Sequence, residues 1–312
     1  KVTMFFYLAV ISLASIWVSI FKNWKSIILT GITGVLLYST SSVFSASMYQ
    51  YDMRYLLLFI SYIISLLYMF TDIWIILKNK FDASGSELYI SIINSIVILG
   101  FTVKIVPKVY QSLVLAGWML VFAITGFFVF MKTRNQKLFY IHSCISIFLL
   151  AVATSIELSG PTLVIAFAIE SAIIAVSAYI VTNDISTSEM MSVTMFLPAF
   201  LSLPSIGSSE WRNGIIHSDF FVLVIMSVMF AIFGLFYKLN QVGVKDDGKI
   251  KLYQFYIICS SFYAFVTVWL CSHSLINNDD TAVFISLFIY TIVGLGAYFT
   301  GIFNQKNLVR IY

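Results

Sequence analysis

A single acidic residue, Glu170, lies inside an apolar stretch that reads S-G-P-T-L-V-I-A-F-A-I-E-S-A from Ser159 to Ala172. If a helix begins at Thr162, Glu170 lies about 12 Å further along its axis, because an α-helix rises 1.5 Å per residue. A charge at the centre of a bilayer costs about 2.5–3.5 kcal/mol, so this carboxyl group should face other protein atoms or a water-filled cavity. Its chemistry there would be proton or cation transfer, or binding of a polar substrate.

A structural role for Glu170 is the alternative, and the two interpretations stay open. In the structural one, the carboxyl group forms a hydrogen bond with another helix, and Ser260 and Ser261 in the stretch C-S-S-F-Y are the candidate partners. The helix around Glu170 carries small residues at helical spacing on roughly the opposite face: Ala168, Ser171, Ala172, Ala175 and Ala178. Because small residues let a neighbouring helix approach closely, this pattern predicts a central place in a bundle.

Other polar residues suggest less chemistry. Asp72 and Lys104 are near the ends of apolar segments and should reach water by extending along the helix, whereas His142 should be a hydrogen-bonded helix residue. A metal site is conceivable only among dispersed residues whose spacing matches no compact zinc pattern: His217, Asp219, Cys271, His273, Asp279 and Asp280. The motifs G-x-S-x-G, H-E-x-x-H, G-x-G-x-x-G and the P-loop are missing from the sequence. We therefore predict no catalytic, metal or cofactor site.

The composition identifies the solvent of this chain as lipid. Hydrophobic residues make up 60% of the 312 residues and charged residues 10%, whereas a soluble domain has about 25% charged residues. The mean hydropathy is +0.97. A net charge of +4 without a long basic run excludes a nucleic-acid surface. The three cysteines show no C-x-x-C spacing and indicate neither a zinc site nor a disulfide framework.

Apolar segments long enough to span a bilayer define the fold class. About 20 apolar residues cross a hydrocarbon core of about 30 Å, and ten segments meet that test: 3–21, 26–44, 55–77, 88–106, 109–131, 138–156, 162–181, 220–239, 252–270 and 281–302. An eleventh, 190–203, is short and contains Pro198, so it is either a thin span or a re-entrant element. The prediction is an all-α, polytopic transmembrane helical bundle of about eleven spans, built from antiparallel hairpins as one domain over 1–312.

Lysine and arginine residues orient the bundle. They are concentrated in the connections that follow the first, third, fifth, ninth and eleventh spans. Because cytoplasmic loops are enriched in these residues, the N-terminal end should lie outside and the C-terminal end in the cytoplasm. The chain starts at Lys1 directly in an apolar run and ends on the basic stretch N-Q-K-N-L-V-R-I-Y. We therefore expect it to be a piece of a longer membrane protein.

One stretch resembles a known family. Gly160, Pro161 and Thr162, followed by Ala166, Phe167, Ala168 and Glu170, are similar to the signature of the domain of unknown function 2339 family of bacterial polytopic membrane proteins. Phe167 stands where that family usually has Trp, and Ser171 where it has Gly. The resemblance implies a many-helix protein of the bacterial cytoplasmic (inner) membrane and singles out Glu170 as the motif acid. It implies no established activity.

The leading functional hypothesis is a transporter or permease-like protein for a small or lipid-linked envelope solute, with Glu170 lining the cavity. The alternative is a non-catalytic membrane scaffold or sensor for envelope partner proteins, which the scarcity of polar groups favours. A membrane enzyme for lipid-linked sugars ranks third, because the connections contain few acidic or histidine clusters. The expected partners are the lipid bilayer and, for a scaffold, envelope or membrane proteins.

Overall fold

The part of the chain that the structure describes is almost entirely helical. The structure is a computed structural model, and it describes residues 2–22, 24–44, 51–78, 85–240, 251–276 and 278–303, none of which forms a β-strand. In chain order the helices are α1 (Val2–Lys22), α2 (Lys25–Phe44), α3 (Tyr51–Lys78), α4 (Gly85–Ile105), α5 (Lys108–Thr133), α6 (Gln136–Glu157), α7 (Gly160–Thr182), α8 (Ile185–Met191), the 3₁₀ turn η2 (Ser192–Met195), α9 (Phe196–Ile206), the 3₁₀ turn η3 (Ser209–Arg212), α10 (Ser218–Asn240), α11 (Leu252–Leu275) and α12 (Asp279–Phe303).

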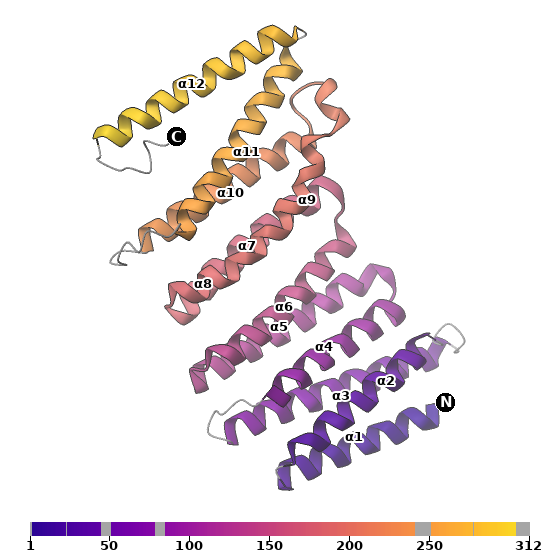
Figure 1. The fold of residues 1–312 in the computed structure, drawn as a ribbon. Helices are drawn as coiled ribbons and strands as arrows, with labels where there is room; N and C mark the ends of the chain where they lie inside the picture. Colours follow the sequence, from indigo (N-terminus) through magenta and orange to yellow (C-terminus); the bar gives the residue numbers. More distant parts are fainter. Residues whose placement is uncertain are drawn as a thin grey trace. The chain divides into compact units, whose positions relative to one another are not determined.

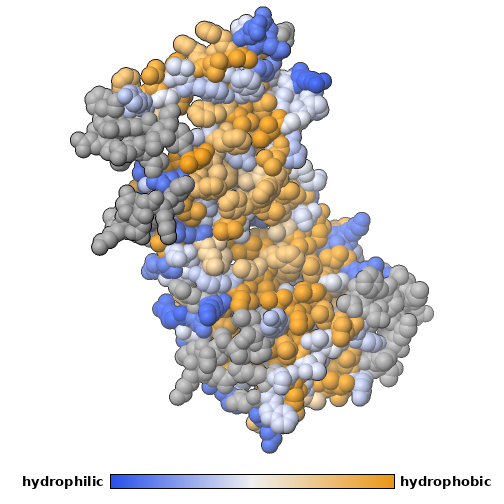
Figure 2. Space-filling model, in the orientation of Figure 1, coloured by the Kyte–Doolittle hydropathy of each residue, from blue (hydrophilic) through white to orange (hydrophobic). Residues whose placement is uncertain are grey.

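The predicted all-α fold is confirmed. Within the described ranges, each of the eleven predicted segments coincides with a helix when α8, η2 and α9 are counted together. Eight helical segments are long and apolar enough to cross a membrane, and three further apolar helices are shorter in their described part. On the face shown in Figure 2, hydrophobic residues dominate the sides of the helices. These are the features of a multi-pass membrane protein, and its orientation across the membrane stays a prediction.

The chain divides into two compact units, residues 1–157 and 158–312; the expectation of a single domain stays a prediction. The first unit contains α1 to α6 (Figure 1). Here α4 packs on α2 and α3, and α5 forms an antiparallel hairpin with α6. The hairpin turn is tight because Arg134 adopts the left-handed conformation with φ 53° and donates its backbone N–H to the carbonyl of Phe130.

The second unit contains α7 to α12 (Figure 1). The antiparallel pair α10 and α11 forms its largest helix contact, and α7 packs on α10, α8 and α9. Gly234 lets this pair approach, since a Cβ atom there would lie 2.7 Å from Cγ1 of Ile257. Helix α12 packs mainly on α11. The core of the unit combines aromatic side chains of α10 and α11 with aliphatic side chains of α7 and α10.

The predicted boundaries 190–203 of the eleventh segment were too narrow. The helical segment runs from Ile185 to Ile206, and its 22 residues are long enough to cross a membrane. Its first turns contain Ser, Thr and Glu, which interrupt the apolar run in the sequence, but Thr187 and Ser188 are fully buried. The 3₁₀ turn η2 comes just before Pro198, whose missing N–H removes one helical hydrogen bond.

Asp184 fixes the start of this segment and should make its stability depend on pH. Its carboxylate accepts hydrogen bonds from the Thr187 hydroxyl at 2.7 Å and from the backbone N–H groups of Thr187 at 3.1 Å and Ser186 at 3.2 Å. These bonds, the Thr187 hydroxyl first, lower the pKa of Asp184. The stabilisation is therefore complete above about pH 4, the usual aspartate pKa, and is lost as the pH falls through the lowered value.

We expect Asp184→Ala to lower the free energy of unfolding by about 1 kcal/mol at pH 7, the usual loss for a helix cap. Asp184→Asn should retain most of the stability, because its single amide oxygen can still accept the two bonds from Thr187. This variant should not lose stability in acid, because an amide does not ionise. Unfolding in detergent micelles, followed by circular dichroism at neutral and acidic pH, measures both effects. Equal stability of Asp184→Ala and the wild type at pH 7 would contradict the assignment.

Candidate functional site

Among the first unit's residues whose burial the structure describes, the most deeply buried acid is Asp72 on α3. Its residue surface is only 1% exposed, and the hydroxyl of Ser91 on α4 donates to its Oδ2 at 2.9 Å. One turn along α4, the Asn94 side chain donates to the carbonyl of Ser65 at 2.9 Å. The expectation that Asp72 reaches water by snorkelling is wrong, because its side chain turns into the contact between α3 and α4.

Asp72 belongs to a row of buried polar residues that we call the polar seam. On α3 the spacing of four, three and four residues places its members on one helix face, and similar spacings occur on α1 and α4. The hydroxyl groups of Ser15 and Tyr68 lie 3.4 Å apart and link α1 to α3. The polar seam comprises Ser12, Ser15 and Ser19 of α1, Ser61, Ser65, Tyr68 and Asp72 of α3, and Ser91, Asn94, Ser95 and Thr102 of α4.

The interior of the polar seam is tightly packed, but not all of its polar groups have a hydrogen-bond partner. Gly31 of α2 packs against it so closely that a Cβ atom would lie 2.5 Å from the Ser15 hydroxyl and 2.8 Å from that of Tyr68. Within the described ranges, the buried hydroxyl oxygen of Ser19 makes no hydrogen bond. A buried hydroxyl without a partner is costly in a low-dielectric interior. The polar seam therefore offers oxygen atoms to a proton, an ion or a water molecule.

The second unit contains a stack of aromatic rings that we call the aromatic column. Successive ring centroids lie 5.3–6.0 Å apart, and the ring planes are inclined by 11–28°. The column comprises Phe230, Phe233 and Tyr237 of α10 and Tyr256 and Tyr263 of α11, all of them buried. Its rings approach the offset stacking geometry that aromatic pairs favour.

Each tyrosine of the aromatic column bonds a serine of the interrupted segment α8–η2–α9. The Tyr237 hydroxyl donates to the carbonyl of Ser188 at 2.9 Å, and the Tyr256 hydroxyl donates to the hydroxyl of Ser192 at 2.6 Å. The hydroxyl groups of Tyr263 and Ser202 lie 2.6 Å apart. The column thus fastens an interrupted helix to α10 and α11 at three levels.

Glu170 lies half-buried on α7. The face that carries the small residues is buried, since Ala168, Ser171, Ala175 and Ala178 are all enclosed, and this part of the prediction is confirmed. The candidate partners of Glu170 donate their protons to backbone carbonyls: Ser260 to Ser227 at 2.8 Å and Ser261 to Ile257 at 3.0 Å. A role for Glu170, and its pairing with these serines, stays a prediction.

The residues of the family-like motif form the start of α7. Gly160 has a positive φ of 59°, which favours glycine, and Pro161 follows within the first turn, where its missing N–H costs no hydrogen bond. The Thr162 hydroxyl donates to the carbonyl of Ser159 at 2.9 Å. Further along, Phe167 and Ala168 are buried and Ala166 is half-buried. The motif thus shapes a turn and a packed helix face.

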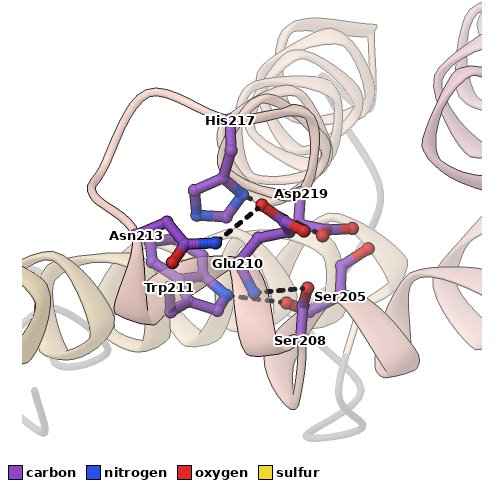
Figure 3. Close-up of polar contacts among 7 residues, drawn as sticks. All are labelled: Ser205, Ser208, Glu210, Trp211, Asn213, His217 and Asp219. Atoms are coloured by element: carbon purple, nitrogen blue, oxygen red, sulfur yellow. Dashed lines mark hydrogen bonds and ion pairs between the residues drawn. The ribbon is translucent and has the colours of Figure 1, made fainter.

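An open pocket lies beside this turn. It encloses about 440 Å³ and is lined by residues of α7, α9, the following turn and the start of α10, among them Pro161, Leu201, Pro204, Ser205 and Asp219. The Trp211 indole N–H donates to the carbonyl of Ser205 at 2.9 Å and fixes one wall (Figure 3). His217 packs edge-on against the Trp211 ring and places its Nδ1 3.9 Å from Oδ2 of Asp219.

The dispersed residues considered for a metal site are not brought together. Within the described ranges, no three His, Cys, Asp or Glu side chains lie close enough to hold a metal ion. His217 and Asp219 form a pair of their own (Figure 3), and the ring of His273 packs on Trp269 instead. The absence of a cofactor stays a prediction.

Sequence reasoning missed both the polar seam and the aromatic column. The signal for the column was the spacing of three and four residues among Phe230, Phe233 and Tyr237, and the spacing of seven from Tyr256 to Tyr263. Comparison of the chain with protein-family models, with curated proteins and with solved structures found no match. The resemblance to the domain of unknown function 2339 family therefore stays a prediction.

Proposed function

We propose that this multi-pass membrane protein is permease-like and moves a small or lipid-linked envelope solute across the bilayer. The observation that supports the proposal most directly is the buried carboxyl group of Asp72 in α3, a helix that meets the criteria for a membrane span. Acids inside transmembrane bundles are expensive and usually mark the path of a proton, an ion or a substrate. The polar seam continues from Asp72 with hydroxyl and amide groups of three helices.

The interrupted segment α8–η2–α9 adds independent support. Transporters commonly bind their substrates where transmembrane helices are discontinuous, because the interruption frees backbone groups inside the membrane. Pro198 and Pro204 both lack the N–H that would complete the helix. Glu170, on the neighbouring helix α7, remains the second candidate acid for this role.

Proton flux into proteoliposomes tests the proposal. We expect the wild-type protein to dissipate an imposed pH gradient and Asp72→Asn to reduce the flux towards that of empty liposomes. The amide keeps an oxygen that can accept the Ser91 hydrogen bond but cannot ionise, so the fold should persist. Glu170→Gln tests the acid singled out by the sequence, and Glu210→Gln, an exposed acid in η3, is the control. Equal flux through Asp72→Asn and the wild type would refute a role for Asp72.

A non-catalytic scaffold or sensor for envelope partner proteins is the second candidate function. The outer surface of α12 favours it, because this helix packs mainly on α11 and exposes a row of large apolar side chains that another membrane helix could contact: Phe284, Leu287, Phe288, Ile292 and Leu295. Lipid covers such a surface equally well. A stable partner that copurifies with both the wild type and Asp72→Asn, with no flux through either, would favour the scaffold.

A further inference from the structure

The pocket beside the start of α7 has the size and lining of a small-molecule site. Its volume of about 440 Å³ falls within the range of about 300–1,000 Å³ that is usual for ligand pockets. Its walls are mainly apolar and come from three helices, with Pro161 and Val164 on α7 and Leu201 and Pro204 on α9. An apolar group of a ligand would therefore be removed from water on several sides.

Asp219 brings a negative charge to this apolar pocket. Its side chain is 13% exposed, and it is the only ionisable side chain that lines the pocket in the described part of the chain. The distance of 3.9 Å to Nδ1 of His217 is too long for a hydrogen bond. The Ser208 hydroxyl accepts a hydrogen bond from the backbone N–H of Glu210, and the Ser205 carbonyl accepts one from the Trp211 indole (Figure 3), so neither of these two bonds involves the Asp219 carboxylate.

Three helix ends border the pocket, and one of them is the start of α10, where Asp219 itself lies in the first turn. The first turn of α7 contributes the partial positive charge of a helix start, about half a unit, and Pro161 lacks one of the N–H groups that would present it. Helix α9 ends beside the pocket at Ile206 and contributes the opposite partial charge. A carboxylate carries a full unit of charge and a helix end about half a unit, so Asp219 is the strongest single charge among the lining residues in the described part of the chain.

We propose that this pocket binds a small organic cation, a protonated amine that carries an apolar group. The apolar group lies against Leu201 and Pro204, and the ammonium group donates hydrogen bonds to the carboxylate of Asp219. This site belongs to the second unit and is independent of the role proposed for Asp72.

Three probes of similar size and different charge test the proposal: 2-phenylethylamine, 2-phenylethanol and 3-phenylpropionate. Binding to the full chain in phosphatidylcholine nanodiscs would be measured by calorimetry at pH 8, where an ordinary histidine is neutral and the amine is still protonated, with empty nanodiscs as the blank. We expect the amine to bind about tenfold more tightly than the alcohol, the lower end for hydrogen bonds to charged groups. The anion should bind most weakly.

Matched variants locate the site. Asp219→Asn should abolish the preference for the amine over the alcohol, whereas Glu210→Gln, which removes an exposed acid close by, should leave it unchanged. Leu201→Trp should fill the pocket and reduce binding of both the amine and the alcohol, while helix content by circular dichroism reports that each variant is folded. Tightest binding of the anion, equal binding of amine and alcohol, a preference that survives in Asp219→Asn, or no binding of any probe would each overturn the proposal.

Discussion

Replacing Tyr256 with alanine should cost about 3–5 kcal/mol of unfolding free energy, the usual loss for removing a buried aromatic ring. Tyr256 is 1% exposed, and its ring stacks against Phe230, Phe233 and Tyr237. Its removal would leave a cavity bordered by both α10 and the interrupted segment. Lipid provides no hydrophobic driving force for the association of helices, so packing contacts such as those of Tyr256 hold the second unit together.

Two further variants separate the contribution of the Tyr256 ring from that of its hydroxyl group, and the effect of a buried position from that of an exposed one. Tyr256→Phe keeps the stack and removes only the bond to Ser192, so we expect a loss of about 0.6 kcal/mol, the average for such bonds between transmembrane helices. Phe262→Ala, at a position on α11 that is 52% exposed, should change stability little. Unfolding by sodium dodecyl sulfate in mixed micelles ranks the three variants. Equal losses for Tyr256→Ala and Phe262→Ala would show that the aromatic column does not stabilise the unit.

The substitution Gly126→Leu should push α5 away from α6 and lower the unfolding free energy of the first unit by about 3 kcal/mol, the upper end of the usual cost of overpacking a core. A Cβ atom at Gly126 would lie 2.9 Å from Cβ of His142, which is attached to the α6 backbone and cannot move aside without it. His142 is itself buried, and its Nδ1 contacts the carbonyl of Leu138 at 3.0 Å. The helix must therefore shift as a whole.

Gly117→Leu is the matched control for this change. It lies on the same helix, is exposed, and a Cβ atom there would meet no other atom within 4 Å. Both changes gain about 0.8 kcal/mol of helix propensity, so Gly117→Leu should be neutral or slightly stabilising. The same detergent unfolding, followed by helix content, measures the difference. If Gly126→Leu is as stable as Gly117→Leu, the close approach of α5 and α6 is not required.

The helices were predictable from the sequence because long apolar runs are interrupted by short polar connections. The short connection between the predicted segments 109–131 and 138–156 predicted the α5–α6 hairpin. The small residues of α7 predicted its buried face. The start of the interrupted segment at Ile185 was not predictable from hydropathy, because its polar residues are buried on one side. Hydropathy sums over all faces of a helix, whereas burial is decided by one face.

The candidate site was less predictable for the same reason. Glu170 drew attention because its surroundings in the sequence are uniformly apolar, yet it is half-buried, whereas Asp72 is enclosed by a neighbouring helix. Which acid is enclosed depends on contacts between helices, and the spacing along one helix does not reveal them. The serine residues that bond the aromatic column were unpredictable for the same reason, since their partners are 49 to 64 residues away in the chain.

That separation bears on how the protein is made. The ribosome completes Ser188, Ser192 and Ser202 before it has synthesised the tyrosines that bond them. During elongation, the newly made segment therefore meets the insertion machinery with its polar side uncovered. The segment gains its full stability in the bilayer only after α11 has emerged. We therefore expect this fold to form more readily if the insertion machinery releases the nascent helices into the bilayer as a group than if it releases them one at a time.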